Sequence, residues 1–302
     1  MSIAGPVAAA ASQRFDTPVF DAAGLAAFAA LYPARAGVIG HRLTQHPLLE
    51  LEALVDLAAV LPAGSVEYNP GALPIGIAPL DVPAPTLSPT ATIRAIETAS
   101  AWMVLKRVEQ HPAYAALLDK ILAELAAVVA PATGAMLRRE GFLFVSSPGA
   151  VTPFHFDPEH NVLLQVRGSK TMTVFPSDDE RLLAPHVQEA FHLGGHHRNL
   201  PWDERFAALG TPLAIGPGEA IHVPVKTPHW VQNGPGVSIS LSVTWRSDWS
   251  EEEAAARGFN HLLRRVGLSP RRPQPYPRRN RAKSLAWRAL LKARTLAGGH
   301  RR

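Results

Sequence analysis

Five short runs rich in β-branched and aromatic residues limit the choice of folds more than any other feature of this chain. They begin near Met136 and read GFLFVSS, NVLLQVRG, KTMTVFP, EAIHVP and VSISLSVTW, with turn-forming residues between them. Short strands spaced in this way are typical of antiparallel barrels and jelly rolls. The sequence therefore predicts a mainly β, α+β protein whose core is an antiparallel double-stranded barrel.

The residues His155-Phe156-Asp157 lie between two of these apolar runs. Alternate side chains of an extended strand point to the same face, so the imidazole of His155 and the carboxylate of Asp157 converge. They supply two ligands of the 2-His-1-carboxylate set that binds Fe(II) and leaves coordination positions open. A His-x-Asp pattern also occurs by chance at the surface ends of strands. His229, which enters a strand after a proline-bounded turn, is a plausible second imidazole.

Further residues around this pair give the chain a family resemblance. In order along the chain the pattern is Thr152, His155, Asp157, Asn161, Lys170, Gly218-Glu219, Pro224 and Pro228-His229. On these residues, the segment from about Phe142 to Trp245 resembles the JmjC and cupin-like Fe(II), 2-oxoglutarate-dependent oxygenases. The pattern is most similar to the branch of the factor-inhibiting-HIF asparaginyl hydroxylase. The resemblance implies a double-stranded β-helix (jelly-roll, cupin/JmjC) core.

The resemblance also implies a role for each residue of the pattern. His155, Asp157 and His229 would bind Fe(II) as the catalytic centre. Thr152 and Lys170 would hold the distal carboxylate of 2-oxoglutarate, the cosubstrate that is oxidised by O2. The remaining cosubstrate contacts would be made by Asn161, Ser242 and Thr244, the last two standing where the family has a late asparagine. The family's tyrosine on an earlier strand has no evident counterpart here.

Lys170 can also be interpreted without the resemblance. It stands among the apolar residues Met172, Val174 and Phe175, where an ammonium group is costly to bury unless an anion accompanies it. The alternative is that its side chain extends to solvent from a strand edge.

The sequence leaves open where two further sets of strand side chains point. Ser238, Ser240, Ser242 and Thr244 alternate with apolar residues, so one face of the last strand is polar. That face either lines a pocket or faces solvent. His222 is interpreted as a pocket or core residue.

Outside the strands, the periodicity predicts mostly helices. The predicted organisation is a disordered leader (1–15), an N-terminal helical region packing on the barrel (16–134), the barrel (135–250) with an insertion (178–212), and a C-terminal helix with a basic tail (251–302). Within 16–134 we expect helices in 16–61, with Asp21 as an N-cap, an irregular connection in 62–89, and helices over 92–110 and 112–129.

The insertion and the tail have unusual compositions. The insertion carries His186, His192, His196, His197 and Arg198, and we expect it to cover the substrate entrance and not to bind a second metal. Residues 271–302 hold 11 of the 30 Lys and Arg residues and no acid. The tail is consistent with a nucleic-acid or ribosome contact, an anionic-membrane contact or a solvated terminus, and Ser284 is a candidate cap for a short amphipathic helix.

The composition narrows the class of protein. Without cysteine there are no disulfides or thiolate metal sites, and without a long apolar run we expect a soluble, cytoplasmic protein. The function expected is hydroxylation of a C–H bond, in a peptide or protein side chain, and demethylation would begin with the same step. Alternatives are a non-catalytic cupin-like metal-binding or regulatory protein, a cupin-type isomerase or hydrolase, and a hydroxylase of a small molecule. A homodimer is possible in each case.

Overall fold

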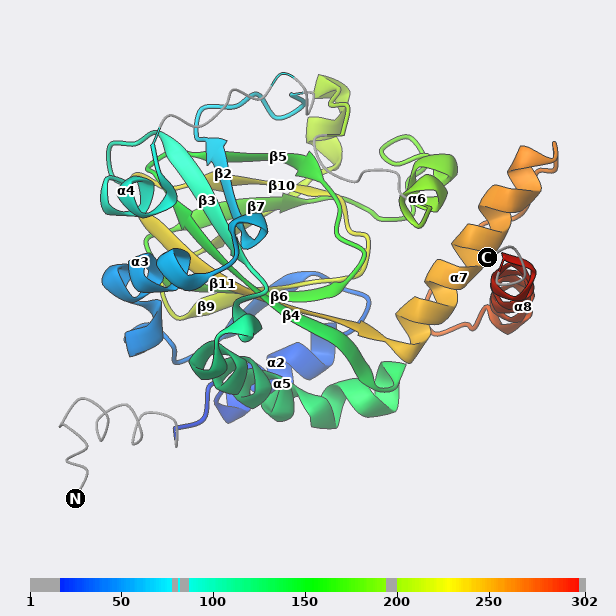
Figure 1. Ribbon diagram of the computed structural model, residues 1–302, viewed down its shortest axis with the longest axis horizontal. Coiled ribbons are helices and arrows are strands. Elements are labelled where there is room, and N and C mark those ends of the chain that lie inside the picture. Colours follow the sequence, from blue (N-terminus) through cyan, green and yellow to red (C-terminus); the bar gives the residue numbers. More distant parts are fainter. Residues whose placement is uncertain (1–16, 78–80, 82–86, 194–199, 299–302) are drawn as a thin grey trace.

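The structure is a computed structural model that describes residues 17–77, 81, 87–193 and 200–298 (Figure 1). The predicted leader (1–15) lies outside these residues, as do His196, His197 and Arg198 of the insertion. The described part of the chain forms two antiparallel β-sheets with helices on one side and at one end (Figure 1).

The larger sheet has seven strands and the smaller sheet has four. In spatial order, the larger sheet consists of β1 (Gly37–Gly40), β9 (Glu219–Val223), β6 (His160–Arg167), β11 (Ser238–Ser247), β4 (Met136–Ser146), β3 (Ala101–Lys106) and β2 (Val66–Pro70). The smaller sheet consists of β5 (Val151–His155), β10 (His229–Asn233), β7 (Lys170–Val174) and β8 (Thr211–Ile215). This architecture confirms the predicted α+β fold with an antiparallel double-stranded β core.

Three helices pack near the outer face of the larger sheet, namely α2 (Ala22–Leu31), α3 (Leu51–Val60) and α5 (Pro112–Thr133) (Figure 1). The Asp21 side chain accepts a hydrogen bond from the backbone N–H of Gly24, so Asp21 caps α2 as predicted. The other helices are α4 (Pro89–Arg94), α6 (Pro185–Phe191), α7 (Asp248–Arg265) and α8 (Arg281–Gly298). Short 3-10 turns occupy Pro47–Leu49, Ala63–Ser65, Val108–Gln110 and Glu204–Leu209.

The expectation that strands begin near Met136 is wrong, because three strands precede it. The helix predicted over 92–110 is a short helix followed by β3, and the irregular stretch 62–89 contains β2. β3 reads AWMVLK and its first five residues are buried, since it lies between β4 and β2. A fully buried strand has no alternation of apolar and polar residues, and a short apolar run cannot be distinguished from a helix by periodicity.

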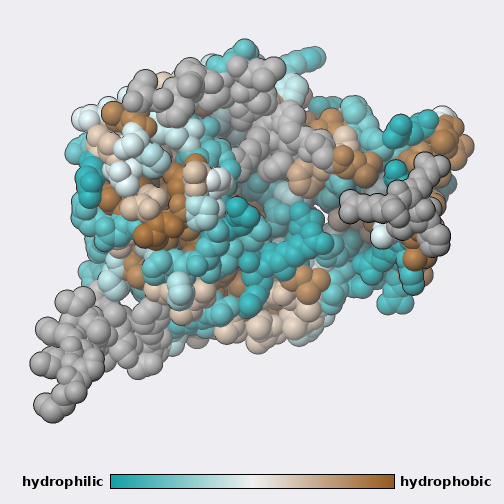
Figure 2. Space-filling model, in the orientation of Figure 1, coloured by the Kyte–Doolittle hydropathy of each residue, from teal (hydrophilic) through white to brown (hydrophobic). Residues whose placement is uncertain are grey.

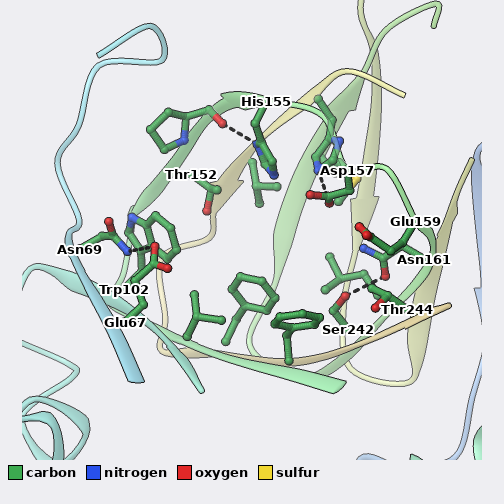
Figure 3. A pocket seen from close by; sticks show the side chains of 18 of the residues that line it. Glu67, Asn69, Trp102, Thr152, His155, Asp157, Glu159, Asn161, Ser242 and Thr244 are labelled. Carbon is green, nitrogen blue, oxygen red and sulfur yellow. Dashed lines mark hydrogen bonds and ion pairs between the residues drawn. The ribbon is translucent and has the colours of Figure 1, made fainter. Parts of the chain in front are cut away.

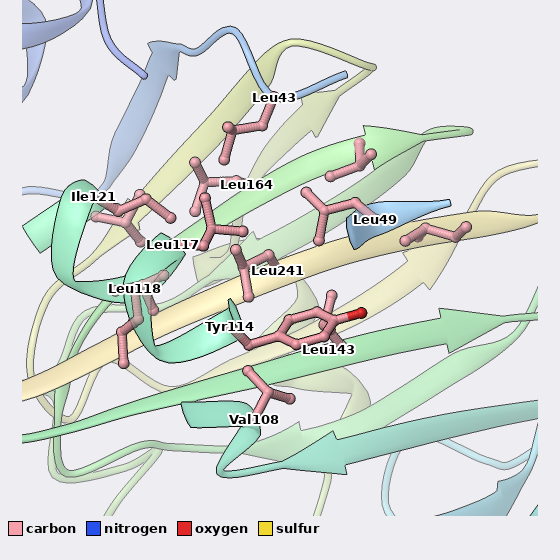
Figure 4. Packing of buried hydrophobic residues seen from close by; sticks show 14 of the residues in the cluster. Leu43, Leu49, Val108, Tyr114, Leu117, Leu118, Ile121, Leu143, Leu164 and Leu241 are labelled. Atoms are coloured by element: carbon pink, nitrogen blue, oxygen red, sulfur yellow. The ribbon is translucent and has the colours of Figure 1, made fainter. Parts of the chain in front are cut away.

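The two faces of the larger sheet differ sharply in chemistry. Leu143, Leu164 and Leu241 face α5, where they pack against Leu117 and Ile121 (Figure 4). Burying one such side chain contributes roughly 1.5–3 kcal/mol, so this layer anchors the sheet. The alternate residues of β11 carry the hydroxyl groups and point to the other face, which is also buried. The polar face of β11 is therefore an inner surface and not a solvated one.

Two long helices end the described chain and pack against each other. α7 begins with a capping box formed by Ser247 and Ser250. α8 follows a connection that is tied back to α7 by an ion pair between Arg279 and Glu252. Ser284 does not cap α8 as predicted, because the helix already begins at Arg281 and the Ser284 N–H donates to the Asn280 carbonyl.

The face shown in Figure 2 mixes hydrophilic and hydrophobic patches. Val266 and Leu268, directly after α7, are among the exposed hydrophobic residues. Among the described residues, no helix is both long enough and apolar enough to cross a lipid bilayer.

Candidate metal centre

A cavity of about 260 Å³ lies between the inner faces of the two sheets. It is lined by residues of β2, β3, β4, β6 and β11 from the larger sheet and of β5, β7 and β10 from the smaller one. All eight residues singled out by the sequence line this one cavity: Thr152, His155, Asp157, Asn161, Lys170, His229, Ser242 and Thr244. Figure 3 labels all of them except Lys170 and His229.

Three of these residues form a compact group that could hold a metal ion. His155 ends β5, Asp157 follows two residues later, and His229 begins β10, directly opposite His155 in the strand register. One ligand atom of each residue lies within 4.8 Å of the other two, and Nε2 of His229 is 3.8 Å from Oδ2 of Asp157. Among the residues described by the structure, no other group of His, Asp and Glu meets this geometry.

Backbone carbonyls fix the orientation of both imidazoles. Nδ1 of His155 is 2.7 Å from the Pro153 oxygen, and Nδ1 of His229 is 2.9 Å from the Thr227 oxygen. Because a carbonyl can only accept a hydrogen bond, Nδ1 carries the hydrogen in each ring and the lone pair is on Nε2. This is the arrangement found around metal-binding histidines.

A buried ion pair supports the turn between β9 and β10, which lies beside Asp157 and leads to His229. The backbone N–H of Lys226 donates to the Asp157 carbonyl at 2.7 Å, with Lys226 in the left-handed region at φ 60°. Its ammonium group pairs with Glu253 of α7, and Glu253 also pairs with Arg257. Burial raises the pKa of Glu253, but the charges of Arg257 and Lys226 outweigh burial and hold it at about 2. The carboxylate is therefore ionised at neutral pH.

Lys170 is buried at the other end of the cavity. Its side chain is 5% exposed, and Nζ donates to the Ser240 hydroxyl at 2.8 Å and lies 5.9 Å from the centre of the Phe144 ring. Burial lowers the pKa of Lys170 to about 7. No carboxylate of the described residues forms an ion pair with it. The alternative that Lys170 extends to solvent from a strand edge is thus wrong.

Smaller polar residues also line the cavity. Ser242 donates to the Asn161 side-chain oxygen at 2.8 Å, and Thr244 donates to the Glu140 carbonyl at 3.3 Å. Thr152 lies between His155 and Trp102 in the view of Figure 3.

The sequence reasoning missed six polar residues of the cavity: Glu67, Asn69, Trp102, Glu140, Ser146 and Glu159. Three of them come from β2 and β3, which were not predicted as strands. Burial raises the pKa of Glu159 to about 6, while its ion pair with Arg246 opposes the shift. Trp102 is 6% exposed, and its indole Nε1 has no hydrogen-bond partner among the described residues.

Two other predictions concern residues outside the ligand set. His222 points to the helical side of the larger sheet, where it contacts the edge of Phe28 and its Nδ1 bonds the Arg35 carbonyl, so it is a core residue.

In the described part of the insertion, α6 brings Phe191 to the cavity, with its ring against Phe156. Burial lowers the pKa of His192 to about 2.

Comparison with known proteins identifies the class to which this site belongs. Residues 94–251, more than half of the chain, match the family described as Cupin-like domain, and the chain belongs to that family. The match confirms the cupin and JmjC resemblance, whereas the placement in the factor-inhibiting-HIF branch remains untested.

Two curated relatives share about a third of the chain. The Jumonji C domain-containing protein 5 of Drosophila melanogaster is 32% identical over 102 residues, which is 32% of this chain and 25% of the relative. The lysine-specific demethylase JMJ30 of Arabidopsis thaliana is 30% identical over 113 residues, 35% of this chain and 26% of the relative. The matched segment thus spans only about a quarter of each relative.

A solved structure is similar over most of the chain. The protein YcfD of Escherichia coli aligns with 87% of this chain and 66% of its own length, at a TM-score of 0.50 and 17% identity. At this identity the similarity supports the fold alone. YcfD is described as a ribosomal oxygenase.

Proposed function

We propose that this protein is an Fe(II)- and 2-oxoglutarate-dependent oxygenase that hydroxylates a C–H bond of a peptide or protein side chain. The observation that carries the proposal is the pairing of two groups in one cavity. His155, Asp157 and His229 lie together in one part of the cavity. Lys170, which is buried and has no carboxylate partner among the described residues, lies in another part. Such a cavity suits a metal ion together with an anion that reaches from the metal to the lysine.

The donor set fits an Fe(II) ion. Nε2 of His155, Nε2 of His229 and a carboxylate oxygen of Asp157 would hold the metal, and their small number leaves positions for other ligands. When bound, the iron and the cosubstrate would supply the oxidising chemistry. The protein contributes the fixed tautomers, through the carbonyls of Pro153 and Thr227, and the position of Asp157, through Lys226.

The rest of the cavity fits a dicarboxylate. The ammonium group of Lys170 would meet the distal carboxylate, with the Thr152 hydroxyl as a second donor. Asn161, Ser242 and Thr244 would contact the part of the cosubstrate nearer the metal. The sheets exclude bulk water from Lys170, which strengthens the attraction between the opposite charges.

The choice of a protein side chain as substrate is supported by one relative, the Arabidopsis thaliana protein that is named as a lysine-specific demethylase. Demethylation begins with hydroxylation of the methyl group, so one site chemistry serves both outcomes.

The proposal is tested by anaerobic titration of the Fe(II)-loaded protein with 2-oxoglutarate. Bidentate chelation gives a weak visible charge-transfer band, which we expect in the wild type and in Lys292→Ala, a control on the exposed face of α8. Lys170→Ala should form the band only at much higher cosubstrate concentration. If the wild type binds iron without forming a band, the oxygenase assignment is wrong and a cupin-like metal-binding protein is the better description.

A further inference from the structure

Exposed hydrophobic side chains gather on the C-terminal helices. Eleven large hydrophobic residues are exposed in the described part of the chain, and six of them lie between Val266 and Leu296. Four of the six are leucines of α8, and two of these, Leu285 and Leu296, are 67% and 62% exposed. Single exposed leucines are ordinary on protein surfaces, whereas a group of them on one element indicates a contact surface.

The other side of α8 packs on α7. Ser284 is buried, and Lys283 donates to the Asn260 side-chain oxygen at 2.7 Å. A Cβ atom on Gly258 of α7 would lie 2.7 Å from the Trp287 ring, so this glycine lets the indole approach the helix closely. α8 is thus fixed to α7, and Figure 1 shows this pair of helices at one end of the molecule, apart from the two sheets.

The two most exposed leucines lie on the side of α8 that faces away from α7. Leu296 follows Leu285 by three helical turns, so the two side chains project within about 20° of each other. Trp287 projects from the opposite side, about 200° around the helix from Leu285. The small residues Ala289 and Ala293 lie next to the leucines on the helix surface. The solvent-facing side of α8 therefore carries an apolar stripe.

Positive charge borders this apolar stripe. α8 contains no acidic residue and five basic ones, namely Arg281, Lys283, Arg288, Lys292 and Arg294. Arg281 and Arg288 stand four and three residues from Leu285, which places them beside it on the helix surface. Lys292 is related in the same way to Leu296, and the side chains of Arg281, Arg288 and Lys292 are exposed. The outward face of α8 is both apolar and cationic.

This combination distinguishes among the surfaces that could cover α8. A second copy of the chain would bring two cationic helices together, and like charges that face each other oppose association. A nucleic acid would match the charge, but contacts to its phosphates would leave the leucines in water. The surface of an anionic bilayer accommodates both groups, because leucines enter the boundary of the acyl chains while Arg and Lys of the same helix reach the headgroups.

We propose that α8 docks this protein on an anionic lipid surface, with Leu285 and Leu296 in the acyl boundary and Arg281, Arg288 and Lys292 at the headgroups. The inference does not depend on the proposed oxygenase activity, because it rests on the exposed face of one helix. The helix would lie along the membrane surface. Each basic residue near an anionic leaflet strengthens binding by about fivefold, and two leucines alone are too few to hold the protein on a neutral membrane.

Cosedimentation of the full chain with lipid vesicles tests the apolar part of the proposal. The vesicles contain phosphatidylcholine alone, or equal parts of phosphatidylcholine and phosphatidylglycerol. Leu285→Gln/Leu296→Gln removes the apolar stripe, and Val60→Gln, at the end of α3 and 66% exposed, is its control. We expect the wild type and the control to bind the anionic vesicles and not the neutral ones. The double variant should bind the anionic vesicles at least about tenfold more weakly.

The charges are tested by Arg281→Gln/Arg288→Gln in the same assay. Its control, Arg94→Gln/Arg139→Gln, removes the same net charge from exposed positions outside α8. Binding to the anionic vesicles should weaken by about 25-fold in the α8 variant, since two contacts to headgroups are lost, and by much less in the control. Equal losses in the two variants would show that only the net charge of the protein matters.

A fluorescent label on the leucine stripe gives a direct readout of insertion. The chain has no cysteine, so Leu296→Cys can carry a single polarity-sensitive fluorophore. Its emission should shift to the blue on anionic vesicles, as expected for transfer from water to the acyl boundary. The same fluorophore on Val60→Cys should not shift. Equal emission from the two labelled proteins would show that α8 does not enter the lipid.

Three further results would overturn the proposal. The first is a wild type that does not bind anionic vesicles. The second is unchanged vesicle binding by Leu285→Gln/Leu296→Gln, and tight binding of a duplex oligonucleotide by the wild type would then assign the charge to nucleic acid. The third is a dimer in light scattering that the same variant dissociates without losing vesicle binding, which would assign the leucines to a second copy of the chain.

Discussion

Two buried lysines, Lys170 and Lys226, show how differently one residue type is used in two regions of this protein. Both are nearly inaccessible, at 5% and 3% exposure. Lys226 pairs with Glu253, and burial lowers its pKa only to about 8 because that carboxylate opposes the shift. Lys170 has a single hydroxyl partner, and burial lowers its pKa to about 7.

The difference distinguishes a lysine whose charge stabilises the fold from a lysine whose charge would bind a ligand. The Lys226 pair is complete within the chain and holds the turn between β9 and β10, which bonds to the Asp157 carbonyl and leads to His229, against α7. Lys170 would be completed only by an anion in the cavity. A substitution at the first pair should therefore affect the folded state itself, and a substitution at the second should affect ligand binding and leave folding intact.

The largest effect is expected from Glu253→Gln. This change leaves Lys226 and Arg257 buried without their carboxylate, so the free energy of unfolding should fall by about 3–5 kcal/mol in urea titrations. Glu52→Gln is the control, because its pair with Arg94 is solvent-exposed and should contribute less than about 1 kcal/mol. Equal losses in the two variants would show that the Lys226 pair is not structural.

Lys170→Met, unlike Glu253→Gln, should weaken ligand binding without lowering stability. Removing an ammonium group without an acidic partner should leave the stability of the unliganded protein unchanged or higher, since the methionine fills similar volume without desolvating a charge. Binding of 2-oxoglutarate should weaken by roughly 100-fold, or about 3 kcal/mol, for the loss of a buried charge pair. Calorimetric unfolding and anaerobic titration measure the two effects. A large loss of stability would place Lys170 with Lys226 among the structural residues.

Because the pKa of Lys170 is about 7, the affinity for 2-oxoglutarate should depend on pH. The ammonium form binds the carboxylate, so affinity for 2-oxoglutarate should fall as pH rises through about 7. Between pH 6.5 and 8.5 the loss should approach about 25-fold, the change in the protonated fraction of the unliganded protein. In Lys170→Met this decrease should be absent, and a decrease that persists would have to come from another group.

The stability of the unliganded protein should rise, where the affinity for 2-oxoglutarate falls, as the pH increases above 7. The folded pKa of Lys170 lies below its ordinary value of 10.5, so the unfolded chain binds more protons between pH 7 and 10.5. The penalty for burying the charge is fully present below pH 7 and is relieved as pH rises through this window. The unliganded wild type should therefore gain stability from pH 7 to 9 relative to Lys170→Met.

The convergence of the candidate site residues in one cavity could be predicted from the sequence, whereas some of the strands around them could not, for a physical reason. His155 and Asp157 belong to one short strand and its continuation, where the period of two brings the two side chains to one face. Thr152, three residues before His155, was identified only through the family resemblance. Lys226 and Glu253 are brought together by α7, and no local pattern records a contact between a loop and a helix. Trp102 was missed because β3 lacks the alternation that distinguishes a strand from a helix. Glu67 was missed because β2 is short and lies in a stretch rich in proline and glycine, which favours an irregular connection.

The smallest expected effect concerns Ser240, the one hydrogen-bond partner of the Lys170 ammonium among the described residues. Ser240→Ala removes an acceptor of modest strength, so 2-oxoglutarate binding should change by no more than about fivefold, or about 1 kcal/mol. The pKa of Lys170 should fall further, because the protonated form loses its partner, and the pH at which affinity declines should move below that of the wild type. Ser238→Ala, on the same face of β11 but bonded to Gln165, is the control and should leave that pH unchanged. If Ser240→Ala abolished binding, the serine and not the lysine would be the main contact to the ligand.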